Sequence, residues 1–180
     1  ELIEDFMLLA NRTVAETLGK PGSKWSNNTF VYRIHDEPNP EKLNKFMLLI
    51  SRLGYTMNLS NRTTLVHSYN KLFEDVEGKG EKNLIQTVAL RTMAKAVYST
   101  DNIGHYGLAF DYYTHFTSPI RRYPDLMVHR LIERYLIEGQ GSVNKKEYEE
   151  MCVHASEMEK QAEEMERQSI KYKQAEYLQD

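Results

Sequence analysis

The sequence predicts an α+β fold that is mostly helical, with a few strands and a long C-terminal helix. Apolar residues recur at spacings of three and four in most segments, and breaks that contain Gly or Pro separate these segments. Residues 29–34 form a β-branched and aromatic run that is typical of a strand. The 180 residues can bury a core as one domain, so we expect residues 1–180 to form a single unit. Because the chain begins at Glu1 and not at Met, we expect it to be a fragment of a longer protein.

The first predicted helix covers residues 1–18, and the breaking sequence at residues 19–22 ends it. Its first two turns are apolar on most sides, which indicates that they are buried. Glu4 is the exception, and it shares one helix face with Asn11. The helix dipole alone favours a glutamate near a helix start, so the residues themselves do not require a further role for Glu4.

The middle of the chain is predicted to be helical after the strand at residues 29–34. Asn39 is expected to cap a helix whose first residue is Pro40, because proline needs no amide hydrogen at that position. The helices expected in this region span residues 40–52, about 61–76 and about 82–97.

Residues 104–113 predict a second strand. One of its faces carries only Gly107 and Ala109, which permits close approach of another backbone or of a ligand, or tight packing under a helix. His105 and His115 lie at its two ends. Neither histidine has the carboxylate neighbours expected of a metal site, so we assign no metal to this chain.

The stretch His115–Arg130 carries the densest candidate site. Ser118 followed by Pro119 predicts a helix start, and Thr117 and Ser118 add hydroxyl groups beside two arginines, Arg121 and Arg122. Such a start can bind a phosphate or a carboxylate. Pro124 lacks the amide hydrogen that would bond to residue 120, so the helix either kinks there or begins again there. In the alternative interpretation the arginines pair with structural acids.

The last predicted helix is the longest. Its stripe of methionine, alanine and tyrosine residues extends from Tyr148 to Glu176, which predicts a helix of roughly 35 residues, about 50 Å long. Small and methionine residues in the stripe favour packing against its own domain, and the remaining faces are charged.

Composition excludes several classes of function. The net charge of −3 argues against a generally basic nucleic-acid-binding protein, so any RNA site has to be a local patch. The single cysteine, Cys152, rules out an internal disulfide and a multi-cysteine zinc site. The sequence shows neither a membrane-spanning run nor a signal peptide, and we expect a soluble, cytoplasmic protein.

The run HFTSPIRRYPDLMVHR at residues 115–130 resembles the signature of the RNB family of 3′-to-5′ exoribonucleases, most closely its bacterial ribonuclease R type. The sequences GHYGLA at residues 104–109, VYRIHDEP at residues 31–38 and LIEDFM at residues 2–7 also resemble that family, in the family's order. The resemblance covers nearly the whole chain and implies the carboxy-terminal half of an RNB catalytic domain.

The resemblance also implies roles for individual residues. Arg121 matches the catalytic arginine that contacts the phosphate near the scissile bond, with Arg122 and Tyr123 in support. Glu4 matches a glutamate that contacts the 3′-terminal nucleotide, and Glu166 matches a glutamate that touches RNA in part of the family. The implied partner is the 3′ end of single-stranded RNA, and Thr117 and Ser118 join the expected RNA-binding residues.

The resemblance implies Mg²⁺ held by clustered aspartates, which precede this region in the family. This chain has seven aspartates and none within two residues of another, so we expect the parent enzyme to bind Mg²⁺ elsewhere and the isolated chain to be inactive. Two other interpretations remain open, a non-enzymatic helical interaction module and a phosphate-binding module. The strands of an incomplete sheet would also leave open edges, through which a non-native dimer can form.

Overall fold

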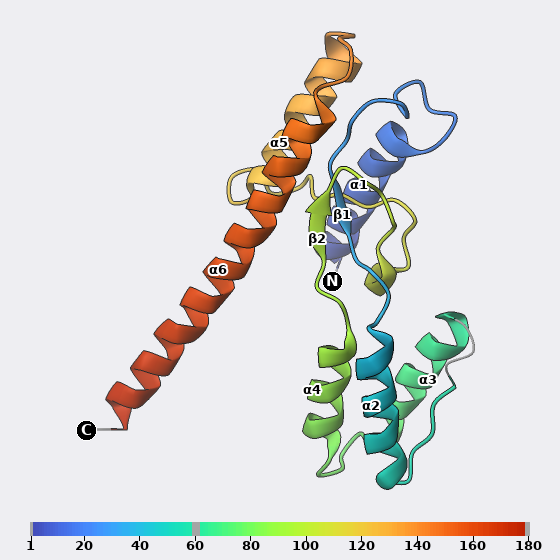
Figure 1. Cartoon of the computed structure of the whole chain (residues 1–180), viewed down its shortest axis with the longest axis vertical. Coiled ribbons are helices and arrows are strands. Elements are labelled where there is room, and N and C mark those ends of the chain that lie inside the picture. The colour runs from blue at the N-terminus through green and yellow to red at the C-terminus, as the bar shows by residue number, and fades with distance from the viewer. Residues whose placement is uncertain (1, 59–61, 179–180) are drawn as a thin grey trace. The chain divides into compact units, whose positions relative to one another are not determined.

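The computed structural model describes residues 2–58 and 62–178, and the chain divides into two compact units (Figure 1). The first unit combines the residues up to His35 with those from Ala96 onward, and the second unit is Asp36–Lys95. Within the described residues no helix is long and apolar enough to cross a membrane. The predicted fold class, mostly helical with two short strands and a long last helix, is confirmed.

The described residues of the second unit form the helices α2 (Pro40–Arg52), α3 (Arg62–Asp75) and α4 (Lys82–Thr92). The predicted cap of α2 is confirmed, because Asn39 Oδ1 accepts a hydrogen bond from Lys42 N at 3.1 Å. Residue 61, the predicted start of α3, lies outside the described residues. The predicted extension of α4 to residue 97 is wrong, because the chain leaves the helix at Met93, whose ψ is 145°.

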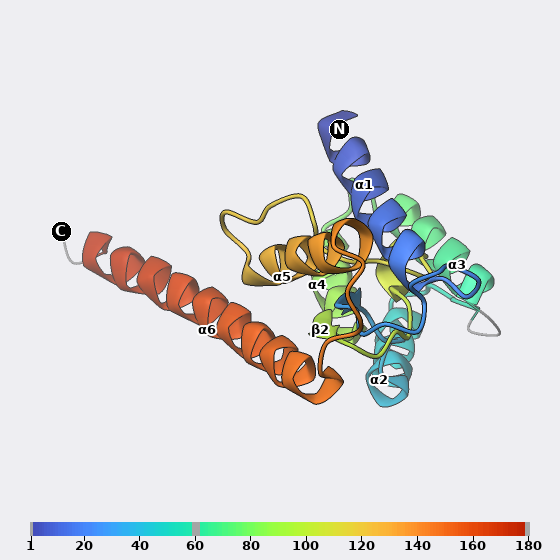
Figure 2. The same ribbon diagram turned by 90° about the horizontal axis from the view of Figure 1, so that it is seen from above.

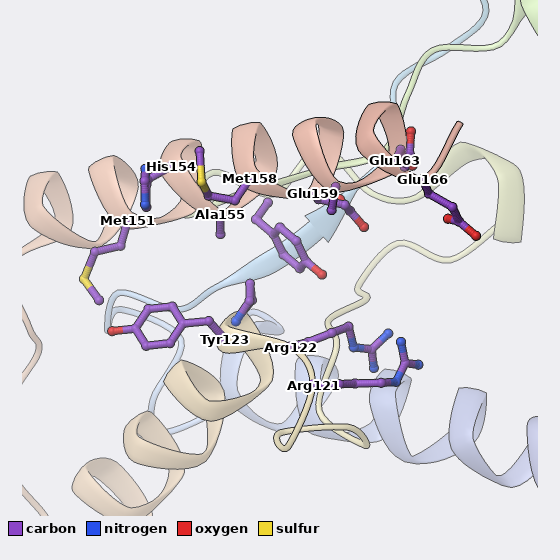
Figure 3. A pocket seen from close by; sticks show the side chains of 13 residues that line it. Arg121, Arg122, Tyr123, Met151, His154, Ala155, Met158, Glu159, Glu163 and Glu166 are labelled. Atoms are coloured by element: carbon purple, nitrogen blue, oxygen red, sulfur yellow. The ribbon is translucent and has the colours of Figure 1, made fainter. Parts of the chain in front are cut away.

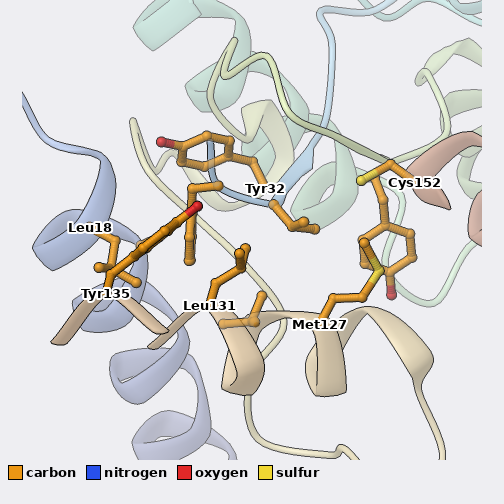
Figure 4. Close-up of a cluster of buried hydrophobic side chains, with 11 residues drawn as sticks. Leu18, Tyr32, Met127, Leu131, Tyr135 and Cys152 are labelled. Atoms are coloured by element: carbon orange, nitrogen blue, oxygen red, sulfur yellow. The ribbon is translucent and has the colours of Figure 1, made fainter. Parts of the chain in front are cut away.

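The first unit has helices α1 (Leu2–Gly19), α5 (Tyr123–Ile132) and α6 (Lys145–Tyr177) and strands β1 (Tyr32–Ile34) and β2 (Val97–Ser99). A five-residue π-helical segment, Glu133–Ile137, continues α5. Side chains from α1, β1, α5 and α6 meet in its core. The labelled members in Figure 4 are Leu18, Tyr32, Met127, Leu131, Tyr135 and Cys152.

The two strands form an antiparallel pair in which Arg33 is opposite Tyr98. Their outward amides are used within the unit: Arg33 N donates to Tyr113 O at 2.9 Å, and Tyr98 N donates to Ser156 Oγ on α6 at 2.9 Å. These contacts do not support a dimer that forms through open strand edges. The C-terminal half of α6 extends away from the other elements of this unit, and its residues are exposed (Figure 2).

The predicted strand at residues 104–113 is wrong. His105 and Phe110 exchange backbone hydrogen bonds of 2.8 and 3.3 Å around a 3₁₀ turn, Tyr106–Leu108. Ala109 then adopts a left-handed conformation with φ of 56°, which reverses the chain. The alternation of small and large residues therefore reflects a tight turn. Gly107 is in this turn, and its amide donates to His35 Nδ1 at 3.0 Å.

The first two turns of α1 are not buried, contrary to the prediction. Leu2, Ile3, Phe6 and Leu9 are 69%, 77%, 62% and 58% exposed. The helix is anchored only further along, where Asn11, Ala15 and Leu18 are buried. The described residues do not cover the apolar face of these first two turns.

Candidate functional site

The candidate site begins at a tight turn between Ser118 and Arg122. Ser118 O accepts hydrogen bonds from Arg121 N at 3.3 Å and from Arg122 N at 3.1 Å, so residues 119–121 form the top of the turn. Helix α5 begins only at Tyr123, with Pro124 in its first turn. The predicted helix start at Ser118-Pro119 is therefore wrong, and the alternative of a start near Pro124 is confirmed. The missing amide hydrogen of Pro124 explains why no helix runs through.

Asp125 fastens both ends of this turn. Its carboxylate is fully buried, and Oδ2 accepts from Ser118 N at 2.8 Å and from Arg122 Nη2 at 2.8 Å. Arg122 thus pairs with an acid of the same chain, as the alternative interpretation expected. Its side chain is 19% exposed and keeps one face toward solvent.

The segment before the turn is held from two helices. Asn11 on α1 accepts from Phe116 N at 2.9 Å and donates to Tyr113 Oη at 3.1 Å. His129 on α5 pairs through Nε2 with Phe116 O at 2.9 Å, and the rings of these two residues stack at 4.2 Å. The neighbouring Thr117 Oγ1 is buried and has no hydrogen-bond partner among the described residues. Residues 113–117 therefore have a fixed path toward the turn.

A groove of about 850 Å³ lies between the start of α5 and the side of α6 (Figure 3). Arg121, Arg122 and Tyr123 line one side, and Glu166 lines the other, so the structure brings four of the predicted residues together. Met151 and Met158 of α6 also line the groove. In Figure 3 Met151 lies near Tyr123, whereas Glu166 lies toward the end that holds the two arginines. The groove therefore has an apolar end and a charged end.

Three predicted residues do not line this groove. Glu4 is exposed on α1, two helical turns before Asn11, and is not among the residues that line the groove. Thr117 and Ser118 precede the arginines, and the Ser118 amide is already used by Asp125. Ser118 is not the cap of the predicted helix start, because α5 begins at Tyr123 and its N-cap residue is Arg122.

Arg121 is the least constrained cation of the site. Its side chain is exposed, and its guanidinium has no hydrogen bond or ion pair with any residue that the structure describes. Ile120 beside it is 101% exposed, so the turn presents both side chains outward. A free guanidinium at the end of a groove can bind two oxygens of a phosphate or a carboxylate.

Tyr98 lines the groove and forms a hydrogen-bonded pair with His115. Tyr98 Oη and His115 Nδ1 are 2.8 Å apart. Burial, together with the nearby Arg122, lowers the pKa of His115 to about 3, and burial raises the pKa of Tyr98 to about 12. Both groups are therefore uncharged at neutral pH. His115 adds no positive charge to the site.

An ion pair between Arg33 on β1 and Glu159 on α6 lies next to Tyr98. The Arg33 guanidinium donates to both oxygens of Glu159 at 2.7 and 3.0 Å and stacks over the Tyr98 ring at 4.5 Å. This ion pair neutralises the negative charge of Glu159, one of the acids that line the groove. Within residues 2–58 and 62–178, no group of three or more His, Cys, Asp or Glu side chains could hold a metal ion. The described side chains therefore do not fit a magnesium centre by themselves.

Sequence reasoning missed Asn11, Asp125 and His129 as parts of the site. Asp125 is at the third position of α5, where an acid is common for the helix dipole alone, so its pairing gave no local signal. The Asn11 contact joins residues 105 positions apart, which a single sequence cannot show.

Comparison with protein-family models gives a match to the RNB domain over residues 1–138. Ribonuclease R of Aquifex aeolicus is 40% identical over 179 residues, which cover 98% of this chain and 24% of that protein. Ribonuclease R of Thermotoga maritima is 38% identical over 187 residues, which cover 99% of this chain and 25% of that protein. The chain therefore spans about a quarter of the length of these curated relatives.

Solved structures give the same result. Mycoplasma genitalium RNase R, in complex with ribose-methylated single-stranded RNA, superposes with a TM-score of 0.81 at 30% identity, covering 95% of this chain and 27% of that one. Yeast Ssd1, described as a pseudonuclease, superposes with a TM-score of 0.71 at 23% identity over 86% of this chain and 19% of that one. The second likeness concerns the fold alone.

Proposed function

Because the chain belongs to the RNB family, we propose that it is part of a hydrolytic exoribonuclease that degrades RNA from the 3′ end to nucleotides. The observation that carries this proposal is the exposed, unpaired Arg121 guanidinium at the charged end of the groove. This chain supplies the wall of the active site that positions RNA and phosphate.

In this proposal Arg121 is the catalytic residue of the chain. Its fork binds two oxygens of the phosphate next to the scissile bond and offsets the charge that develops there in the transition state. Arg122 is already bound to Asp125, so its role is to add positive potential and to support the turn. Tyr123 and the methionines at the apolar end offer a surface for a base.

Glu4 and Glu166 are proposed to contact the nucleotide and not its phosphate. Both side chains are exposed carboxylates, which accept hydrogen bonds from sugar hydroxyls or from base amino groups and repel phosphate. Acceptance from a 2′-hydroxyl would favour RNA over DNA. Thr117 and Ser118 complete the proposed set of RNA-binding residues, although the Thr117 hydroxyl is buried in the free chain.

The magnesium ions implied by the family are assigned to a part of the protein outside this chain. The seven aspartates here are dispersed, and the described side chains do not form a site that fits the metal. When bound, the metal would activate the attacking water and stabilise the leaving oxygen.

We further propose that residues 1–180 are the carboxy-terminal half of an RNB catalytic domain. The exposed apolar residues at the start of α1 support this, because a contiguous apolar face usually marks a contact with other protein. That face would then contact the rest of the domain. Cytoplasmic localisation stays a prediction that no feature of the structure tests.

A non-enzymatic helical interaction module is the second candidate, because the exposed C-terminal half of α6 offers a surface for a partner and a fold by itself does not determine activity. An RNA-cleavage assay of the full-length protein distinguishes the exoribonuclease from the non-enzymatic role. With single-stranded RNA labelled at its 5′ end and Mg²⁺, an exoribonuclease shortens the label-bearing strand from the 3′ end, whereas a pseudonuclease binds RNA without shortening it. We expect shortening by the full-length protein and none by residues 1–180 alone. Trimming by the pure 180-residue chain would overturn the assignment of the metal ligands to another part.

A further inference from the structure

The turn that carries Arg121 is closed by a single carboxylate oxygen. Asp125 Oδ2 accepts from the first residue of the turn, Ser118, and from the last, Arg122, each at 2.8 Å. The backbone bond from Arg122 N to Ser118 O, at 3.1 Å, closes the same turn. Arg121 lies between these two fixed ends, and its side chain has no hydrogen bond or ion pair among the described residues. The residues on both sides of Arg121 are therefore held by Asp125.

The ion pair between Asp125 and Arg122 has a hydrogen-bond arrangement that is poor for stability alone. Asp125 is fully buried, yet its Oδ1 has no hydrogen-bond partner among the described residues, and Arg122 Nε and Thr117 Oγ1 are buried and unpartnered beside it. A buried charge is costly unless its hydrogen bonds are complete, and incompletely bonded buried groups concentrate where function requires a particular geometry. The cluster occurs only a few residues from Arg121, at the charged end of the groove.

We propose that Asp125 is a positioning residue that acts through Arg121. It does not touch substrate, because it is fully buried and the groove is lined by its neighbours and not by Asp125 itself. It holds Ser118 and Arg122 so that the Arg121 guanidinium faces the phosphate. This inference rests on the role proposed for Arg121 and adds the residue that determines the geometry of that role.

A double-mutant cycle in the full-length protein tests the inference. Single-turnover rates on a short RNA are measured for Asp125→Asn, Arg121→Ala and the double variant, together with RNA binding and thermal melting. We expect a loss of about 100-fold for Arg121→Ala and of about tenfold or more for Asp125→Asn, mainly in rate and not in binding. The double variant should be no slower than Arg121→Ala, because a residue that acts through Arg121 has nothing left to position.

The matched control is Glu149→Gln. Glu149 is a partly buried carboxylate that, like Asp125, accepts a hydrogen bond from a backbone amide, that of Thr100 at 2.6 Å, but it does not line the groove. It should lower the melting temperature and leave the rate within about twofold of the wild type. A comparable rate loss in this control would mean that general destabilisation explains the effect, and the inference would be wrong.

The outcomes separate the inference from the proposed function. If the rate losses of the two single variants multiply in the double variant, Asp125 does not act through Arg121, and only this inference fails. If Arg121→Ala retains near-normal rates, the proposed function fails as well.

Should Asp125→Asn not fold, Arg122→Lys replaces it in the cycle, because lysine keeps the charge beside Asp125 but loses the planar fork. The same lack of additivity is then expected, and multiplication of its loss with that of Arg121→Ala overturns the inference.

Discussion

Replacing Arg121 with alanine should remove most of the activity of the full-length protein while leaving its fold intact. The side chain is exposed and has no partner among the described residues, so its loss should change the free energy of unfolding by less than about 0.5 kcal/mol. Loss of a group that stabilises transition-state charge typically lowers the rate by about 100- to 1,000-fold, which corresponds to about 3–4 kcal/mol. RNA binding should weaken much less, because one phosphate contact among several is removed.

The assay is single-turnover cleavage of an end-labelled oligonucleotide, combined with a binding titration on the same RNA. Arg121→Lys should fall between wild type and Arg121→Ala, since lysine keeps the charge but cannot bind two phosphate oxygens at once. Arg130→Ala is the control, because Arg130 is also an exposed arginine of this unit but does not line the groove. Near-normal turnover by Arg121→Ala, or an equal loss in Arg130→Ala, would refute the reasoning.

Two further predictions concern sugar selection and pH. Glu4→Gln should reduce the preference for a 3′-terminal ribonucleotide over a deoxyribonucleotide several-fold, measured as the ratio of cleavage rates on two otherwise identical oligonucleotides; an unchanged ratio would remove Glu4 from the site. Burial lowers the pKa of His115 to about 3 and that of His105 to about 4, from 6.5 in the unfolded chain, so below pH 6.5 the unfolded chain binds protons that the folded chain does not. Folding stability should therefore be fully retained above about pH 6.5 and decrease as the pH falls toward 4, by at most about 1.4 kcal/mol per pH unit for each histidine. Chemical denaturation at several pH values measures this, and a weaker dependence is expected in His115→Gln; identical slopes in the two proteins would contradict the assignment.

Where the sequence carried a complete local signal, the structure agrees with it. Asn39 and Pro40 define the start of α2 by themselves, because a cap and a preset φ act within one helical turn. The long α6 is similarly determined by its own periodicity, and its N-cap is Asn144, whose side chain accepts hydrogen bonds from the amides of Lys146 and Glu147. These elements need no distant partner to be recognised.

Where the conformation depends on distant partners, the sequence was misleading. Residues 97–99 form a strand only because β1 lies beside them, and local helical periodicity extended the predicted helix into them. The segment 104–113 alternates like a strand, but contacts with His35 fold it into a turn. In both cases the deciding residue lies more than 60 positions away in the chain.

In the candidate site, too, the sequence identified Arg121 but not the conformation around it, and this conformation determines which groups can bind the phosphate. The sequence predicted Arg121 at a helix N-terminus, where free backbone amides would also bind the phosphate. In the structure α5 begins after Arg121, and Pro124 has no amide hydrogen in its first turn. The Ser118 amide is also unavailable, because it donates to Asp125. A phosphate-binding module built on the Ser118-Pro119 helix start thus loses its structural basis, whereas the role of Arg121 does not depend on it. A guanidinium on a turn held by a buried acid can bind phosphate without helix amides, so the recognition depends on the side chain and on the residue that orients it.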